Sequence, residues 1–365
     1  MRSISDTIAR LQPRSIGPAV DRLVDLSEPF ANPGNLRART FVPEHLPPGA
    51  ALVVVLHGCT QTAAGYDHGS GWSDVADRGG FALLFPEQVR ANNPNLCFNW
   101  FQDGDTTRGQ GEVASVRAMI ETMIARHALD PAKVFITGLS AGGAMTAAML
   151  ATYPEVFAGG AIIAGLPHGT ASSVPEAMER MRGHGIPDAR TLGLAVDEAS
   201  SHRGAWPPVS VWHGSADATV VPATGEAVVA QWLAVHGLAS ADAELDIVDG
   251  HAHRVWRARD GRVAVESHVI AGMGHGTPLD TEGCGVGGAF MLDVGVSSTL
   301  RIAESWGLID ATSVRRAHAS KPTPSHHGVS ERWPSITGGA PSRQTPSQGV
   351  GAVIEDALRA AGLMR

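Results

Sequence analysis

Short apolar runs alternate with longer segments of helical character along most of the chain. Five runs of four to six residues are rich in β-branched or aromatic residues; they cover Ala51–Leu56, Phe81–Phe85, Val134–Thr137, Ala161–Ala164 and Val209–Trp212. Such runs, when Gly or Pro bounds them, are typical of strands buried on both faces. The pattern therefore predicts a sheet whose two faces are both covered.

Two of the intervening segments predict helices. In Glu112–His127 the apolar residues recur at intervals of three and four, which is the period of an amphipathic helix. Ala141–Thr152 is apolar on nearly every face, so we expect a fully buried helix there. Buried strands that alternate with helices indicate the α/β class, with a mostly parallel central sheet and helices on both faces.

After Ala239 the alternation of short apolar runs with helical segments becomes less regular. Ala243–Val248 and His253–Arg257 are candidate edge strands, and the alternation in Arg262–Ile270 predicts a further strand. Ser297–Trp306 is expected to be the closing helix of the core.

Changes in composition divide the chain into four segments. We expect a helical extension over residues 1–36, with helical patterns around 4–11 and 19–26. An α/β catalytic domain should follow over residues 37–312. Beyond it we expect a linker-like tail rich in Pro, Ser and Gly over 313–350 and a short amphipathic helix within 351–365. A lone helix of that length is marginal in water, so the last segment is expected to dock on another surface.

Composition and charge argue against several classes of protein. The chain of 365 residues is 43% apolar and 18% charged, which fits a large folded core. Its formal net charge of −8 argues against partners such as nucleic acid or an anionic membrane. No stretch approaches the roughly 18 apolar residues of a membrane helix, and the N-terminus shows no apolar export signal. Three cysteines are too few for a disulfide framework.

The segment from Gly138 to Gly142 has the form G-x-S-x-G, with Ser140 at its centre. A buried strand precedes it and the all-apolar helix follows, which is the setting of a nucleophile elbow. We expect a side chain at Gly138 or Gly142 to collide with neighbouring backbone, because the turn is tight. An ordinary Gly-rich turn in which the serine caps the helix is the plainer alternative.

A serine nucleophile needs a base, and in this arrangement an acid and then a histidine follow it along the chain. Asp217 lies just past the strand that ends near Trp212, where the sites of α/β proteins gather. Its rivals Asp188 and Asp197 lie in a Gly- and Ser-rich insertion, and Asp280 comes after the candidate histidine.

The candidate base is His275, which again lies just past a strand and has small neighbours. Among the 16 histidines, His268 falls inside the strand, and His326 and His327 fall in the tail. The negative charge that develops during acyl transfer needs two backbone N–H donors. We assign these to Ala141, which follows the nucleophile, and to Cys59, in the loop that begins with the His57-Gly58 pair.

Other residues carry weaker signals. Asn99, Trp100 and Phe101 lie in a Gly- and Asn-rich loop and are candidates to line the acyl site, as are Trp206 and Trp306. A place in the core is an equally good reading of each tryptophan.

The remaining cysteines and histidines imply little. Whether Cys59 and Cys97 form a disulfide stays open, since the sequence does not give the distance between them. If they do, Cys284 is left without a disulfide partner. The pair His251 and His253, like the histidine pair in the tail, lacks ligand neighbours at metal-binding spacing, so we predict no metal site and no cofactor.

Six motifs resemble the polyhydroxybutyrate depolymerase family of α/β-hydrolase esterases. They occur in order as HGCTQT at 57–62, LFPEQ at 84–88, NNPNLCFNWF at 92–101, GLSAGGAM at 138–145, WHGSAD at 212–217 and GMGHGTP at 272–278. The resemblance spans about residues 40–308. It implies serine-dependent hydrolysis of short-chain polyhydroxyalkanoates, and feruloyl and acetylxylan esterases are near relatives. The family's catalytic Ser, Asp and His map onto Ser140, Asp217 and His275.

The resemblance also qualifies the expected substrate and compartment. Secreted members that attack solid polymer usually carry a linker and a separate adsorption domain, whereas here only a short helix follows the tail. Soluble oligomers, amorphous polymer or small esters are therefore the expected substrates. A feruloyl-type or small-ester carboxylesterase is the alternative, and a binding scaffold without activity is a remote one. The family suggests export and the N-terminus shows no signal, so compartment and oligomeric state stay open.

Overall fold

The computed structural model describes residues 21–310. Its strands are β1 Val24–Asp25, β2 Arg37–Phe41, β3 Leu52–Leu56, β4 Ala82–Glu87, β5 Val134–Leu139, β6 Gly159–Ile163, β7 Val209–Gly214, β8 Glu244–Val248, β9 His251–Arg257, β10 Val263–Ile270, β11 Thr277–Leu279 and β12 Met291–Asp293. Ten of them form one sheet in the order β1-β2-β4-β3-β5-β6-β7-β10-β9-β8, and β11 pairs with β12 separately.

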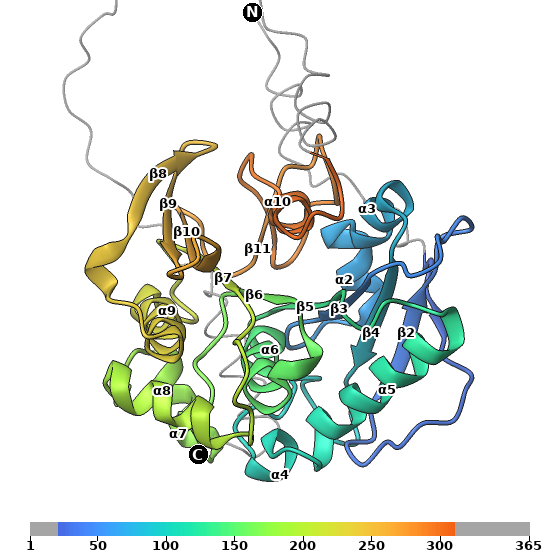
Figure 1. Cartoon of the computed structure of the whole chain (residues 1–365), viewed down its shortest axis with the longest axis horizontal. Coiled ribbons are helices and arrows are strands. Elements are labelled where there is room, and N and C mark those ends of the chain that lie inside the picture. The colour runs from blue at the N-terminus through green and yellow to red at the C-terminus, as the bar shows by residue number, and fades with distance from the viewer. Residues whose placement is uncertain (1–20, 311–365) are drawn as a thin grey trace, which may run out of the picture.

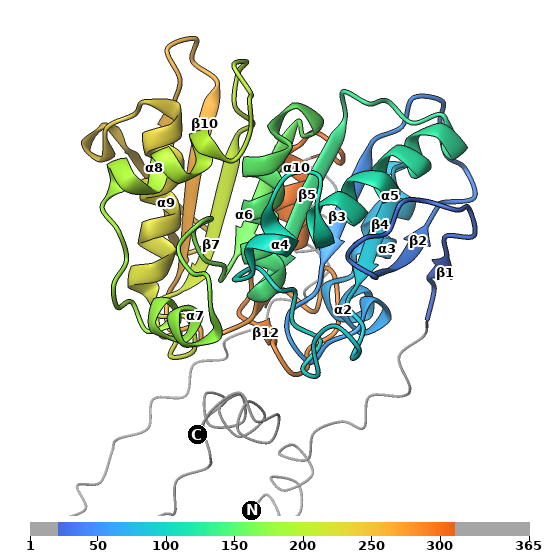
Figure 2. The same ribbon diagram turned by 90° about the horizontal axis from the view of Figure 1, so that it is seen from below.

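The helices lie on both faces of this sheet (Figures 1 and 2). They are α2 Ala63–Ser70, α3 Trp72–Gly79, α4 Asp103–Thr106, α5 Gly111–His127, α6 Ala141–Thr152, α7 Val174–Met181, α8 Ala189–Glu198, α9 Pro222–His236 and α10 Ser298–Ser305, with 3₁₀ turns η1 Pro154–Val156 and η2 Ser240–Asp242. All neighbouring strands from β4 to β10 run parallel, and the two outermost strands at each edge run antiparallel. The prediction of a mostly parallel sheet between two helical layers is confirmed.

Alternate residues of each central strand pack into different cores. On β3, Leu52, Val54 and Leu56 join the core beneath α5, α6 and α9, whereas Val53 and Val55 join the core beneath α2, α3 and α10. All five are fully buried, so both faces of the strand must be apolar. This explains why the buried strands read as continuous apolar runs in the sequence.

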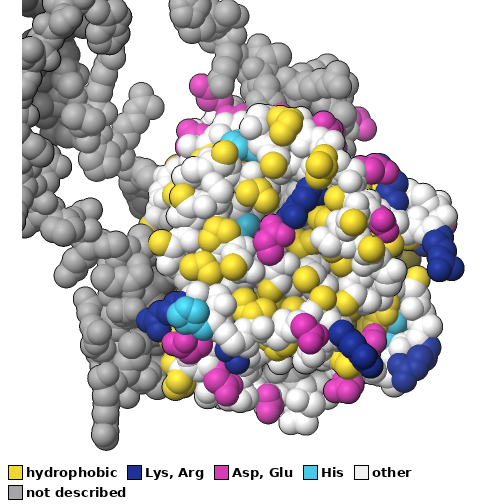
Figure 3. Space-filling view, turned by 90° about the vertical axis from the view of Figure 1, so that its left-hand side faces the viewer, with side chains coloured by type: hydrophobic (Ala, Val, Ile, Leu, Met, Phe, Trp, Pro, Cys, Tyr) yellow, Lys and Arg dark blue, Asp and Glu magenta, His cyan; other side chains and the backbone are white. Residues whose placement is uncertain are grey.

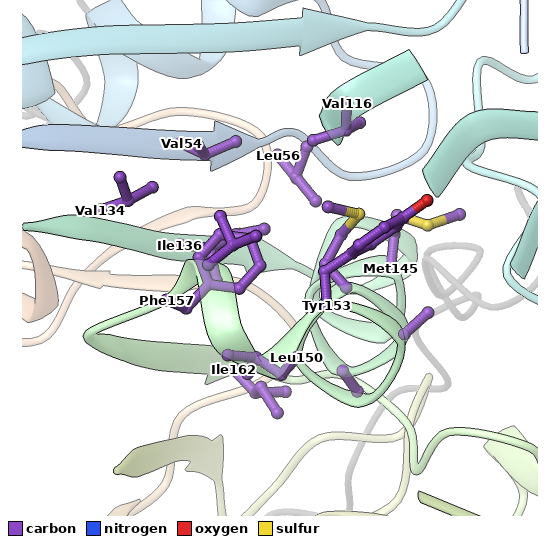
Figure 4. Packing of buried hydrophobic residues seen from close by; sticks show 14 of the residues in the cluster. Val54, Leu56, Val116, Val134, Ile136, Met145, Leu150, Tyr153, Phe157 and Ile162 are labelled. Carbon is purple, nitrogen blue, oxygen red and sulfur yellow. The ribbon is translucent and has the colours of Figure 1, made fainter. Parts of the chain in front are cut away.

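The first core forms around α6, as Figure 4 shows. Met145 and Leu150 of this helix lie between it and the strands, beside Leu56, Ile136 and Ile162. Every residue of α6 is buried, as its sequence predicts. The helix is therefore held on all sides, and so is the turn that precedes it.

The described part of the predicted N-terminal helical extension is not helical. No helix occurs over residues 21–26; instead Val24 pairs with Thr40, and Asp25 with Arg39, at the edge of the sheet. The Arg39 guanidinium donates to the carbonyl oxygen of Leu23, so contacts distant in sequence override the local helical pattern. The pattern at 4–11, the tail at 313–350 and the helix predicted within 351–365 lie outside the described residues.

The opposite edge of the sheet exposes apolar side chains. Leu245 and Ile247 on β8 are 77% and 66% exposed, and Leu194 on α8 is also exposed. On this side of the molecule, hydrophobic side chains lie among charges of both signs (Figure 3). Within residues 21–310, no helix has the combination of length and apolar character that crossing a membrane requires.

Candidate active site

The turn between β5 and α6 has the strained shape that the G-x-S-x-G sequence predicts. Ser140 has φ of 56° and ψ of −116°, a conformation with positive φ that lies outside the helical regions and is unusual for a residue with a side chain. A Cβ atom at Gly138 would lie 2.4 Å from the carbonyl oxygen of Gly142, and one at Gly142 would lie 2.4 Å from that of Leu56. The predicted collision is confirmed, so both glycines are required for the backbone to pass.

The structure brings Ser140, His275 and Asp217 into one hydrogen-bonded chain. Ser140 Oγ lies 2.9 Å from His275 Nε2, and His275 Nδ1 lies 2.7 Å from Asp217 Oδ2. The three residues follow the carboxyl ends of β5, β10 and β7. Because these strands run parallel, their ends meet at one edge of the sheet.

Asp217 is buried and accepts hydrogen bonds at both carboxylate oxygens. The backbone N–H groups of Thr219 and Val220 each donate to Oδ1 at 2.9 Å, leaving Oδ2 to His275. Burial by itself would raise the pKa of Asp217, but the hydrogen bond from His275 and the charges of His275 and His213 outweigh it and hold the pKa below its usual value. The carboxyl group therefore stays ionised, which favours a proton on His275 Nδ1.

The loop after β3 is fixed by His57. The backbone N–H of Gln88 donates to His57 Nε2 at 3.1 Å, so Nδ1 carries the proton and donates to the carbonyl oxygen of Gly58 at 2.8 Å. The N–H of Gly58 in turn donates to Gln61 Oε1 at 2.9 Å. Burial lowers the pKa of His57 and keeps its ring neutral.

A disulfide between Cys59 and Cys97 ties this loop to the segment after β4, which answers the question that the sequence left open. Thr60 N–H donates to the Asn95 carbonyl oxygen at 2.7 Å, and Gln88 Nε2 donates to that of Cys97 at 3.0 Å. Cys284 is an unpaired, buried thiol. The loop that carries Cys59 is thus held by covalent and hydrogen bonds.

The two predicted backbone donors belong to segments that adjoin Ser140. Ala141 is the first residue of α6, where a backbone N–H has no acceptor within its own helix. Cys59 lines a small cavity of about 20 Å³ together with Ser140 and His275. Both amides therefore belong to segments that adjoin Ser140.

Sequence reasoning missed Phe290, which lines the same cavity. Its ring meets that of His275 edge to face, with centroids 6.1 Å apart, and its φ of 60° turns the chain at this point. Phe290 comes from the loop before β12, far from any motif in the sequence. Only the pairing of β12 with β11 brings it to His275.

Asn99 was predicted to line the acyl site, but its polar groups are used inside the protein. Its Oδ1 accepts from Asn93, its Nδ2 donates to Asp105, and its backbone N–H donates to Glu112. The side chain is buried, so it shapes the loop.

Trp100 packs on a small apolar cluster of Ala144, Leu166 and Val220, in which Ala144 lies one turn of α6 beyond Ser140. Its ring also lines a neighbouring cleft of about 480 Å³ with His168 and Arg180. Phe101 meets Trp100 edge to face. Trp100 therefore does not line the small cavity beside Ser140, although the cluster on which it packs includes a residue of α6 close to Ser140.

The structure corrects the prediction for Trp306. This ring stacks on Phe135, with centroids 4.8 Å apart, and on Trp72 at 6.2 Å. Phe135 lies near the start of β5, whereas Ser140 follows the end of this strand. Trp306 therefore packs in the core at the end of β5 that is opposite to Ser140. Trp206 likewise packs on the first core, beside Trp232.

The other residues considered as the acid or the base from sequence lie outside the hydrogen-bonded chain of Ser140, His275 and Asp217. Asp188 caps α8 by accepting from Thr191 N–H, and Asp197 is exposed on the same helix. Asp280 lies in the turn after β11, and His268 stacks on Trp212 within the sheet. His326 and His327 lie outside the described residues.

The chain is similar to known ester hydrolases. A family model described as esterase PHB depolymerase matches residues 42–245. Poly(3-hydroxyalkanoate) depolymerase C of Paucimonas lemoignei is 45% identical over 296 residues, covering 80% of this chain and 71% of that protein. Feruloyl esterase B of Neurospora crassa is 31% identical over 259 residues, covering 69% of this chain and 87% of that protein.

A solved structure shares the architecture. The acetyl xylan esterase from Aspergillus awamori superposes with a TM-score of 0.67 at 23% identity, covering 79% of this chain and 99% of that one. At this level of identity the likeness concerns the fold.

Proposed function

The chain belongs to the esterase PHB depolymerase family, and from this premise we propose that Ser140, His275 and Asp217 are the catalytic triad of an enzyme that cleaves short-chain polyhydroxyalkanoate esters. The protein is a carboxylic ester hydrolase with the α/β-hydrolase fold. The observation that carries the assignment of residues is the hydrogen-bonded chain from Ser140 through His275 to Asp217.

In the proposed first half-reaction, His275 Nε2 takes the hydroxyl proton as Ser140 Oγ attacks the ester carbonyl carbon. Asp217 keeps the other ring proton on Nδ1 and stabilises the imidazolium that forms. The N–H groups of Cys59 and Ala141 donate to the carbonyl oxygen as it becomes negative. The C–O bond then breaks, and the alcohol leaves with the proton from His275.

In the second half-reaction, water takes the place of the alcohol. His275 accepts a proton from the water as it attacks the acyl-enzyme, and it returns the proton to Ser140 Oγ when the acid is released. No group beyond these side chains and amides is needed for the proposed cycle.

The relatives of this chain carry the proposed substrate class. The cavity beside Ser140, at about 20 Å³ and bounded by Cys59, Leu139 and Phe290, is too small to enclose a substrate and does not by itself select one. The 45% identity to a poly(3-hydroxyalkanoate) depolymerase points to the same substrate class. The alternative, a feruloyl-type or small-ester carboxylesterase, rests on the 31% identity to feruloyl esterase B.

The residue assignment is tested by Ser140→Ala. We expect kcat on p-nitrophenyl butyrate to fall at least about 10⁴-fold, because the variant lacks the hydroxyl that lies 2.9 Å from His275 Nε2. Ser172→Ala, in an exposed loop, is the matched control and should keep full activity. An undiminished rate in Ser140→Ala with an unchanged circular dichroism spectrum would overturn the assignment.

The substrate class is tested separately, with amorphous poly(3-hydroxybutyrate), p-nitrophenyl butyrate and methyl ferulate assayed side by side. We expect cleavage of the polymer and of the butyrate ester. Cleavage of the ferulate ester alone would favour the alternative.

A further inference from the structure

Two histidines and a glutamate face one another on the sheet, away from the triad. His253 on β9 pairs directly with His268 on β10, and Glu266 lies two residues before His268 on the same face of β10. Each offers a ligand atom, and the three atoms lie within 4.8 Å of one another. Because β9 and β10 are adjacent (Figure 1), this cluster joins two strands of the outer sheet.

The sequence conceals this cluster. His251 and His253 have no carboxylate at metal-binding spacing along the chain, and we predicted no metal site for that reason. The carboxylate instead reaches His253 across the sheet, from Glu266. The pairing of β9 with β10 thus brings a carboxylate to His253, although the sequence places none at metal-binding spacing from it.

From this juxtaposition we infer that His253, Glu266 and His268 form a binding site for a divalent transition-metal ion of the Zn²⁺ type. Two imidazoles and one carboxylate are a common ligand set for zinc, with water in the remaining position.

The distances between the ligand atoms suit one ion. Glu266 Oε2 lies 3.2 Å from His268 Nε2 and 3.6 Å from His253 Nε2. Atoms that share a tetrahedral Zn²⁺ ion at bonds of about 2.0–2.2 Å are about 3.3–3.6 Å apart. Both pairs are therefore already close to the separation that the ion would impose.

One ring must turn to complete the site. The imidazoles of His253 and His268 stack with centroids 4.3 Å apart and planes at 19°, whereas a shared ion has to lie in the plane of both rings. His268 is held on its other face by Trp212, with ring centroids 3.7 Å apart. In the described part of the chain the one polar contact of the His253 ring is the long one to Glu266 Oε2, at 3.6 Å, so rotation about its Cβ–Cγ bond gives up only a weak contact.

Both ring nitrogens of His253 are also hidden from solvent. A buried polar atom without a partner costs free energy, and a bound ion would supply that partner. The nearby cation of Arg301, on α10, is already paired with Asp249 at 2.7 Å and with Glu304 at 3.0 Å. Its charge is thus balanced by neighbours outside the cluster.

The test is metal binding by the full chain after treatment with a chelator, titrated with Zn²⁺ and with Co²⁺, whose visible spectrum reports tetrahedral coordination. We expect one ion per chain with a matching rise in melting temperature. His253→Ala should weaken binding by about 100-fold or more. Glu266→Gln, which keeps the size of the side chain, should also weaken binding while leaving the circular dichroism spectrum unchanged.

Two controls isolate the site. His184→Ala removes an exposed histidine that pairs with Glu179 at 2.9 Å, and it should leave the binding unchanged. The double variant His326→Ala/His327→Ala, which alters residues outside the described part, should do the same. Failure of the wild-type chain to bind Zn²⁺ or Co²⁺, unaltered binding by His253→Ala and Glu266→Gln, or loss of binding only in the His326/His327 variant would each overturn the inference. The outcome is independent of the proposed esterase activity.

Discussion

Asp217 is held by donors that come from its own loop. The N–H groups of Thr219 and Val220 occupy Oδ1, so the carboxylate presents only Oδ2 to His275. The orientation of the carboxylate is therefore fixed by a short turn of its own loop, and the carboxylate in turn orients the imidazole of His275.

Exchange of this carboxylate for an amide tests the proposed role. In Asp217→Asn the two backbone N–H groups would retain the amide oxygen, leaving its NH₂ group to face His275 Nδ1. The ring proton would then move to Nε2, which could no longer accept from Ser140. We expect kcat on p-nitrophenyl butyrate to fall about 10⁴-fold.

Asp197→Asn, on an exposed part of α8, is the matched control and should be fully active. A loss of less than tenfold in Asp217→Asn would contradict the proposed role.

A second buried carboxyl group predicts a pH-dependent stability. Burial raises the pKa of Asp67 to about 6, although the hydrogen bonds from Ser73 act against this rise. The native state therefore keeps its proton between about pH 4 and pH 6, where the unfolded chain has lost it. The stabilisation from this group is complete below about pH 4 and is lost as the pH rises through 6.

Asp67→Asn should remove that loss, because the amide oxygen can still accept from Ser73 N–H. We expect the free energy of unfolding of the variant, relative to wild type, to rise by about 2–3 kcal/mol between pH 4 and pH 7. Denaturant unfolding at the two pH values measures this difference. A constant difference would show that Asp67 has an ordinary pKa.

The residues of the candidate triad could be selected from sequence because each follows a predicted strand in the expected chain order. The positions of the residues around the candidate triad could not be predicted from sequence. Nothing in the sequence tells which way Asn99 or Trp306 points, and both turn into the protein. Phe290 carries no signal at all, since its position depends on the pairing of two short strands.

At the scale of elements, the loop of Cys59 is the most heavily tied part of the site. Its disulfide to Cys97 closes a loop across 38 residues of sequence. In Cys59→Ser/Cys97→Ser, we expect unfolding to become easier by about 3–4 kcal/mol, because the unfolded chain regains the entropy of that loop. We also expect kcat to fall about tenfold or more, as the N–H of residue 59 loses its fixed position.

Reduction of the wild-type protein with dithiothreitol should produce the same loss of activity, and the double serine variant should not respond to it. Full activity of the reduced wild-type enzyme would separate the disulfide from catalysis.

Elements buried on both faces were the easiest to predict. β3 is entirely apolar, and the only polar residues in β5 and α6 are threonines, so the pattern of these three elements leaves little ambiguity. The strand at Val24–Asp25 was predicted as helix because its apolar spacing suits either structure. Its conformation is decided by pairing with β2, which the local pattern does not contain.

At the scale of the whole molecule, the ten-stranded sheet, both helical layers and the candidate triad all lie within residues 21–310. We therefore expect a fragment of these residues to fold and to hydrolyse p-nitrophenyl butyrate with a kcat within about twofold of the full chain. Steady-state kinetics on both proteins measures this. An insoluble fragment, or one that loses more than about tenfold in kcat, would show that the remaining residues contribute to the fold or the site.

The fold class could be predicted from sequence, whereas the order of the last strands could not. Proximity along the chain favours β8 beside β7, yet β10 takes that place and β8 lies at the edge. A pattern of apolar residues defines a strand and its buried face, but it does not define its neighbour. This is also why the cluster of His253, Glu266 and His268 was invisible before the pairing of β9 with β10 was known.

The place of β10 between β7 and β9 has a consequence for biosynthesis. As the polypeptide leaves the ribosome, β8 and β9 emerge first and have no docking position on the growing sheet until β10 joins β7. His275 follows only five residues after that strand. A nascent chain that already contains Ser140 and Asp217 therefore still lacks the histidine of the candidate triad, and the proposed activity has to await the pairing of β10 with β7.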